Sequence, residues 1–225
     1  MICADPVLSA AKVAALAKSL YHSGPGFRYR MQQYRPYLCP VEVLLSLVPE
    51  AGSVLDIGCG CALLLGLALR SGKDIHAIGV DISEDALKMA AAMKEHGLAH
   101  AEGQRLTLHL SREVADWPAG SFDMVSLIDV MHHVRMDWRT KIIEAAIARV
   151  KPGGILMYKD MCRRPRWRAF QNWCQDLLVS RQWIHYLPIA EVEAMARDAD
   201  LIELRSETIN RLGFGHELRV YRRPG

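Results

Sequence analysis

Apolar runs alternate with amphipathic stretches from position 53 onward. Short apolar runs that end at glycine or at a polar residue predict β-strands, whereas apolar residues at every third or fourth position predict helices. The strands are expected at 53–57, 75–80, 105–110, 122–128 and 155–158, and the helices between them at 61–70, 84–96 and 137–150. This alternation predicts an α/β fold, a parallel sheet with helices on both faces.

Local signals refine this pattern. Ser83 is expected to cap the N-terminus of the helix over 84–96, and Gly97 its C-terminus. The strand over 105–110 alternates polar and apolar residues, which is typical of a strand near a sheet edge, whereas 122–128 is apolar at nearly every position, as expected of a central parallel strand.

The two ends of the chain follow another pattern. Residues 7–21 are expected to form an amphipathic helix on the outside of the protein. Beyond 158 the sequence predicts helices over 166–180 and 188–199, then strands over 201–209 and 214–221 joined by a hairpin-like return.

Composition excludes several classes of protein. The 225 residues carry a net charge of +3, too small for the basic field of a general nucleic-acid binder, and the 51% hydrophobic residues exclude a disordered chain. No apolar run approaches the roughly 18 residues of a membrane span. The first 20 residues include Asp5, Lys12 and Lys18, unlike a signal sequence. The six cysteines lack metal-ligand spacing, so we expect no metal site and a reduced, cytoplasmic protein.

The loop after the first strand is the most informative stretch. Gly58 and Gly60 end a strand before a helix, where a backbone without side chains can approach a ligand closely. The dinucleotide fingerprint requires a third glycine at position 63, which is Leu63. Asp56 would repel a diphosphate but suits a ligand that carries positive charge.

A second carboxylate comes one β-α-β unit later. Asp81 follows the strand over 75–80, where a carboxylate can accept hydrogen bonds from both hydroxyls of a ribose. The two acids together favour a ligand with a ribose, a cationic group and no phosphate. S-adenosylmethionine (SAM) has these properties.

Four motifs carry a family resemblance. VLDIGCG (54–60), GVDIS (79–83), SFDMVSLIDVMHHV (121–134) and VKPGGILMYKD (150–160) occur in the order and near the spacing of class I SAM-dependent methyltransferases. The chain resembles the small-molecule type, similar to ubiquinone/menaquinone biosynthesis methyltransferases. The resemblance implies a Rossmann-like three-layer α-β-α sandwich, a seven-stranded, mostly parallel sheet whose last strand is antiparallel. It covers roughly positions 50 to 160.

The resemblance also implies an organisation and a set of binding residues. We expect a single methyltransferase domain over 1–225, with an N-terminal helical lid (1–50), a SAM-binding core (51–160), and a substrate cap with C-terminal strands (161–225). SAM is the implied cofactor and S-adenosylhomocysteine (SAH) its product. The residues expected to bind SAM in the core are Asp56, Gly58, Cys59, Gly60, Asp81, Ile82, Ser111, Arg112 and Asp129.

The Tyr- and Arg-rich segment over 27–35 lies where many family members fold a lid. Tyr29 is a candidate for lining the methyl pocket and Arg30 for pairing with the SAM carboxylate. A solvated basic segment is the alternative.

Three residues after the fourth strand are candidates for catalysis: Asp129, His132 and His133. A histidine there can remove a proton from a substrate hydroxyl. The alternatives are packing, or contact with the SAM methionine through the backbone. Asp160, at the end of the fifth strand, is either a substrate contact or a surface residue.

The acceptor is expected to be an O- or C-atom of a small molecule. A basic and aromatic stretch, residues 163–168, suits an anionic or carrier-protein-bound acyl substrate, although a solvated helix start is the commoner explanation. Two other functions stay open, a non-catalytic SAM-binding protein and an NAD-dependent oxidoreductase. The oligomeric state is not indicated.

Overall fold

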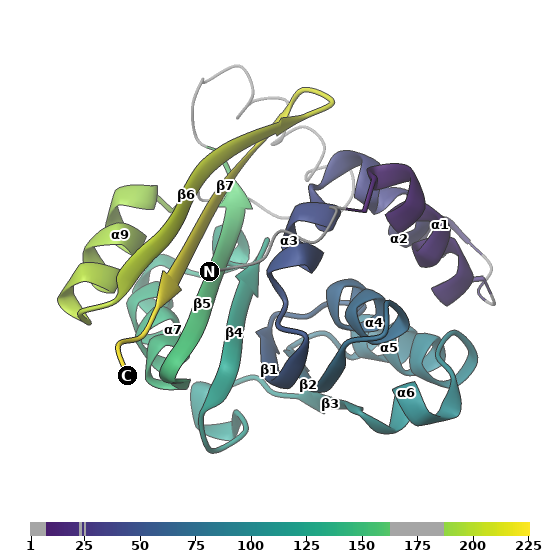
Figure 1. Ribbon diagram of the computed structural model, residues 1–225, viewed down its shortest axis with the longest axis horizontal. Coiled ribbons are helices and arrows are strands. Elements are labelled where there is room, and N and C mark those ends of the chain that lie inside the picture. Colours follow the sequence, from purple (N-terminus) through teal and green to yellow (C-terminus); the bar gives the residue numbers. More distant parts are fainter. Residues whose placement is uncertain (1–7, 23, 25, 163–186) are drawn as a thin grey trace. The chain divides into compact units, whose positions relative to one another are not determined.

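The computed structural model describes residues 8–22, 24, 26–162 and 187–225. The chain forms two compact units, residues 1–117 and 118–225. Figure 1 colours the first unit purple to teal and the second teal to yellow. The strands follow the order β3-β2-β1 in the first unit and β4-β5-β7-β6 in the second, which together give the order of a seven-stranded sheet.

The first unit contains a parallel sheet and most of the helices that the structure describes. Its strands are β1 (Ala51–Ile57), β2 (Asp74–Asp81) and β3 (Leu106–Leu110). Its helices are α1 (Ala10–Leu20), α2 (Phe27–Leu38), α3 (Val41–Leu47), α4 (Leu63–Arg70), α5 (Glu84–His96), α6 (His100–Gln104) and the 3₁₀ turn η1 (Val114–Asp116). The β1–β2 and β2–β3 pairs are parallel, as the alternation predicts. Strand β3 is an edge strand, as its alternating pattern predicts.

Local sequence explains how the helices of this unit begin. The Ser83 hydroxyl accepts the Ala86 N–H at 3.2 Å, so this residue caps α5 as expected. Helix α1 buries Val13, Ala14, Ala17 and Leu20, one face of an amphipathic helix. Helices α2 and α3 lie within residues 1–50, where a helical lid was expected, but the apolar pattern did not give the bounds of either helix, and aromatic and basic residues mask the apolar period of α2.

The second unit builds its sheet from strands of both directions. Its strands are β4 (Phe122–Ile128), β5 (Val150–Met161), β6 (Ile202–Arg211) and β7 (Phe214–Arg222), and its helical elements are η2 (Met131–His133), α7 (Met136–Ala148) and α9 (Ile189–Asp198). Strands β4 and β5 are parallel, and β7 pairs antiparallel with both β5 and β6. Leu212 and Gly213, both with positive φ, turn the chain between β6 and β7.

Strand β5 is longer than the predicted 155–158. The predicted strand begins only at residue 155, but Gly153 and Gly154, just before it, exchange backbone hydrogen bonds with Arg223 at 2.9 Å. The pairing partner therefore holds these glycines in the strand despite their low strand propensity.

The expected fold class is confirmed: a mixed sheet, mostly parallel, with the last strand antiparallel and helices between the strands. The helix expected over 166–180 lies outside the described residues. Among the residues that the structure describes, no helix is both long and apolar enough to cross a bilayer.

Candidate functional site

The loop after β1 is attached to β2 by hydrogen bonds of its own backbone. Gly58 N–H and Cys59 N–H both donate to the Val80 carbonyl, at 2.8 and 3.0 Å. Gly58, Gly60 and Ala62 have φ values of 72°, 55° and 60°. Glycine adopts this left-handed region at little cost, so the two glycines of the motif are required by the shape of the loop.

The Asp81 carboxylate links this loop to the start of α5. One oxygen accepts the Gly60 N–H at 2.7 Å and the other accepts the Ser83 N–H at 2.8 Å. A carboxylate offers about four acceptor positions, so two remain after these bonds. Asp81 thus shapes the loop and keeps capacity for a ligand's hydroxyls.

A glycine in β2 makes room for a side chain of the loop. A Cβ added at Gly79 would lie 2.7 Å from Cys59 Sγ and 3.1 Å from Cys59 Cβ. The Cys59 thiol is buried, and its pKa is raised well above the usual value by that burial and by the nearby charges of Asp56 and Asp81. Cys59 is therefore a packed, protonated thiol beside the loop.

The residues beyond Asp81 differ in exposure. Ile82 is 70% exposed although it is apolar, as expected of a residue that packs on a ligand. Ser111 is buried, and its hydroxyl donates to the Glu113 carbonyl at 2.8 Å. Arg112 is exposed and pairs with Glu84 at 3.4 Å.

Asp56 is buried at the end of β1, opposite Gly79 in the parallel register. Its charge is close enough to raise the pKa of the Cys59 thiol. The two acids of the motif are thus in the same unit as the glycines they were expected to accompany.

The N-terminal helices contact the same loop. The buried Tyr21 hydroxyl donates to the Cys61 carbonyl at 2.6 Å. Tyr29 on α2 lies edge-on to Tyr21, with ring centroids 6.5 Å apart, and Arg30 on the same helix is exposed. Tyr21 is a loop contact that the sequence analysis missed, because it lies 40 residues before its partner.

In the second unit, the loop after β4 begins with a strained residue. Asp129 has a φ of 55° without being a glycine, and such residues concentrate at functional sites. Its carboxylate accepts the Lys159 Nζ–H at 2.5 Å, and its N–H donates to the Lys159 carbonyl at 2.8 Å. The Lys159 side chain is fully buried. The pair therefore fixes the start of the loop to β5.

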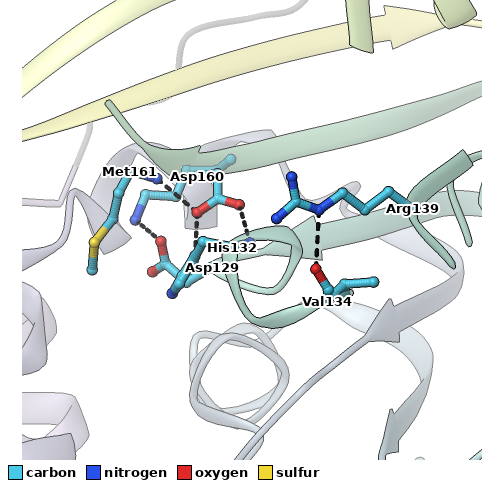
Figure 2. A network of polar contacts seen from close by, with 7 residues as sticks. Asp129, His132, Val134, Arg139, Asp160 and Met161 are labelled. Carbon is cyan, nitrogen blue, oxygen red and sulfur yellow. Dashed lines mark hydrogen bonds and ion pairs between the residues drawn. The ribbon is translucent and has the colours of Figure 1, made fainter. Parts of the chain in front are cut away.

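The next residue of β5 binds the same loop. Figure 2 shows the Asp160 carboxylate with dashed lines to His132 and Met161. It accepts the His132 N–H at 3.1 Å and the Met161 N–H at 2.7 Å, and it pairs with His132 Nδ1. Asp160 is buried, so the alternative of a surface residue is wrong.

The two histidines of the loop are in different environments. His132 is 2% exposed, whereas His133 is exposed. Their rings lie 4.0 Å apart at an interplanar angle of 47°. On the helix that follows, the buried Arg139 donates to the Val134 carbonyl at 3.0 Å and holds the end of the loop (Figure 2).

Strand β7 adds a carboxyl group that the sequence analysis missed. Glu217 lies directly opposite Asp160 in the antiparallel register. Its pKa is raised, chiefly by burial and further by the Asp160 charge, while Arg219 and the Cys162 thiol lower it. The sequence could have indicated Lys159 and Asp160 as site residues, because they are two charged residues directly after a buried strand. No pattern in the sequence indicated Glu217.

The sequence candidates thus fall in two groups. The second unit contains the candidates after β4, which are Asp129, His132 and His133. The first unit contains the other candidates, which are the glycine loop, Tyr29, Arg30, Asp56, Asp81, Ile82, Ser111 and Arg112. Within the described ranges, no cluster of three or more His, Cys, Asp or Glu side chains could hold a metal ion.

Comparisons with known proteins agree with these motifs. The family model described as "Methyltransferase domain" matches residues 29–202. Among curated proteins, the chain is 30% identical over 168 residues to the ubiquinone biosynthesis O-methyltransferase of Hahella chejuensis, covering 71% of this chain and 67% of that protein. The enzyme of the same name from Bordetella avium is 28% identical, covering 66% and 61%. The chain thus spans about two thirds of these relatives' length.

Solved structures share the fold. An O-methyltransferase family protein from Burkholderia thailandensis matches with a TM-score of 0.70 at 22% identity, covering 88% of this chain and 58% of that one. Magnesium protoporphyrin IX methyltransferase from Synechocystis PCC 6803, with bound SAH, matches with a TM-score of 0.66 at 17% identity, covering 93% of each chain. With its four motifs, its strand order and a family model that matches most of its length, the chain belongs to the methyltransferase domain family.

Proposed function

We propose that this protein transfers the methyl group of SAM to a hydroxyl oxygen of a small molecule. The observation that carries the proposal is the loop after β1, whose glycines lie in left-handed conformations and whose Gly60 N–H is held by Asp81. The matched relatives are named as O-methyltransferases of ubiquinone biosynthesis, which supports an oxygen acceptor on a quinone precursor or a related phenol.

The first unit fits SAM in shape and charge. A Cβ added at Gly60 would meet no atom within 4 Å in the described part of the chain, so the backbone there is open to a ligand. Asp81 keeps two acceptor positions for ribose hydroxyls. Ile82 offers an exposed apolar side chain to a base, and the acidic surroundings favour a cation over a diphosphate.

The remaining binding residues have narrower roles in this proposal. Ser111, whose hydroxyl is already used, would contribute through its backbone, and Cys59 through the shape of the loop. Arg30, exposed on α2, would pair with a carboxylate. Arg112, exposed beyond β3, would lie along the base.

The chemistry requires little acid or base catalysis. SAM supplies a methyl group already activated by a cationic sulfur. The chain's own residues bind and orient the reactants, which alone contributes several kcal/mol to the rate. A hydroxyl acceptor must also lose a proton, and the loop with Asp129, His132 and His133 supplies candidates for that step.

Calorimetric titration with SAH tests the cofactor assignment. Asp81→Ala removes both the loop bonds and the acceptor positions for the ribose, and charge-assisted hydrogen bonds contribute roughly 1.5–3 kcal/mol each. We expect SAH to bind the wild type and to bind this variant at least about tenfold more weakly. Asp74→Ala is the matched control, because Asp74 is an exposed aspartate at the other end of the same strand. Undiminished binding by Asp81→Ala, or binding of NAD in place of SAH, would contradict the assignment.

Methyl transfer is measured separately. The protein is incubated with methyl-labelled SAM and a panel of substituted phenols, catechols and small amines, and the products are identified by mass spectrometry. We expect methyl ethers from hydroxyl acceptors. A protein that binds SAH but labels neither this panel nor a metabolite extract would instead be a non-catalytic SAM-binding protein.

A further inference from the structure

Tyr21, directly after α1, joins the N-terminal helices to the loop after β1. Its hydroxyl donates to the Cys61 carbonyl at 2.6 Å, and its side chain is fully buried. Burial raises the pKa of this phenol well above its usual value, and the neighbouring Cys61 and Cys59 thiols raise it further. The phenol therefore keeps its proton and remains a hydrogen-bond donor.

The Cys61 carbonyl lies at a constrained point of the loop. Gly60 and Ala62, on either side of Cys61, have left-handed φ values of 55° and 60°, a conformation that is strained for alanine. The Gly66 N–H donates to the Ala62 carbonyl at 2.9 Å and begins the hydrogen bonding of α4, so the Cys61 carbonyl lies just before the helix. Because a carbonyl shielded from water is costly without a donor, the Tyr21 hydroxyl stabilises this loop conformation.

Two glycines let the end of α1 lie against the helices that follow the two binding motifs. A Cβ added at Gly97 would collide with the Leu20 carbonyl, and one added at Gly66 would lie 3.4 Å from Leu20 Cδ1. Gly66 is on α4, after the glycine loop, and Gly97 ends α5, which begins shortly after Asp81. Leu20 is fully buried, so the backbone next to Tyr21 is fixed against both helices.

The second N-terminal helix contacts the same tyrosine. Gln33 on α2 donates from Nε2 to the Tyr21 carbonyl at 2.9 Å, and the Tyr29 ring lies edge-on to the Tyr21 ring. Both N-terminal helices are therefore connected to the loop through Tyr21.

We propose that Tyr21 is a positioning residue for SAM, whose hydroxyl holds the backbone over 60–62 in the conformation that binds the cofactor. The inference rests on the proposed function and deepens it, because it makes the affinity for SAM depend on the attachment of α1 and α2. Tyr21 is fully buried, so it acts through the loop and not by touching the cofactor. Coupling between two sites is equal in both directions, so bound SAM must also hold α1 more firmly.

Calorimetric titration of Tyr21→Phe with SAH tests the proposal, because this variant keeps the ring and loses only the hydroxyl. We expect SAH to bind roughly five- to tenfold more weakly, the factor by which loss of one buried hydrogen bond changes a conformational equilibrium. Ser71→Ala is the chemical control, since it removes a hydroxyl that donates to the Ala68 carbonyl at 2.8 Å, at the other end of α4. Ile75→Val is the stability control, since it trims a fully buried side chain far along β2 from Asp81. Both controls should bind SAH as the wild type does.

Hydrogen exchange provides a second measurement that needs no variant to fold. In the wild type, saturating SAH should slow amide exchange over α1, and in Tyr21→Phe this protection should be smaller. Undiminished SAH affinity in Tyr21→Phe, an equal loss of affinity in Ile75→Val, or exchange over α1 that SAH leaves unchanged would each overturn the inference. Failure of the wild type to bind SAH would instead overturn the proposed function.

Discussion

The loops after β1 and β4 are held in their conformations by different interactions. Both follow parallel strands and both include left-handed residues, but the first uses Gly58 and Gly60, whereas the second uses Asp129. The first is held by backbone hydrogen bonds to Val80 and by one carboxylate, Asp81. The second is held by buried side-chain pairs from Lys159 and Asp160.

The difference indicates what each loop is built to do. A loop of glycines exposes its backbone, which suits close approach of a ligand. A loop fixed by buried charges keeps its side chains in set orientations, which suits a residue that must meet a substrate with defined geometry. The first loop is therefore expected to be sensitive to added side chains at its glycines, and the second to the loss of the side chains that hold it.

The largest effect should come from breaking a buried pair in the second loop. Asp129→Asn preserves shape and tolerates the left-handed conformation, but it leaves the Lys159 ammonium buried beside a neutral amide. Removing one partner of such a pair costs about 3–5 kcal/mol of unfolding free energy. Urea unfolding measures this loss.

The double variant Asp129→Asn/Lys159→Met sharpens this test, because it removes both charges. It should recover a large part of the lost stability. If the double variant is as unstable as the sum of the two single variants, the two residues do not act as a pair.

The next effect should come from adding a side chain beside the first loop. Gly79→Ala would place a Cβ 2.7 Å from Cys59 Sγ. Such overpacking costs about 1–3 kcal/mol and should displace the loop, so both the unfolding free energy and the affinity for SAH should fall. Gly103→Ala, at a helical glycine where the nearest atom is 3.3 Å away, is the milder comparison. Equal behaviour of the two variants would contradict tight packing at Gly79.

Gly60→Ala distinguishes an effect on folding stability from an effect on SAH affinity. An alanine with a left-handed φ costs about 1–2 kcal/mol, and the added methyl group meets open space in the described structure. The loss of stability should therefore be modest, while SAH affinity, measured by calorimetry, should fall by more than about tenfold because the methyl group occupies ligand space. A variant that loses stability but keeps its SAH affinity would show that the backbone there does not face the ligand.

The smallest effect concerns Glu217. Its pKa is raised in the folded protein, so the folded state binds more protons than the unfolded state and stability falls as the pH rises through the interval between the two pKa values. Glu217→Gln abolishes this dependence, so relative to the wild type it should be more stable at pH 7 than at pH 4. Parallel thermal melts at the two pH values measure the difference, with the exposed Glu203→Gln as control. A relative stability that does not change with pH would exclude Glu217 as the titrating group.

The sequence predicted the first loop far better than the second. Gly58, Gly60, Asp56 and Asp81 carry their own signal, because their residue types and spacing follow from the geometry of one β-α-β unit. The predicted strands recovered all seven strands of the sheet, with β5 too short because Pro152, Gly153 and Gly154 resemble a turn.

The position of the second loop could be predicted from the sequence, but the different environments of its residues could not. Asp129, His132 and His133 were named together, yet exposure separates them, and exposure depends on partners about 30 residues away in β5. The cross-strand position of Glu217 depends on the register of β7, which no local pattern specifies.

A crystal structure of the protein soaked with SAH tests the central claim most directly. The account predicts a nucleoside whose ribose hydroxyls donate to the free acceptor positions of Asp81, whose base lies against Ile82, and whose remaining atoms pass over the Gly58–Gly60 backbone. Density for the nucleoside elsewhere, or a dinucleotide bound at this loop in preference to SAH, would contradict it.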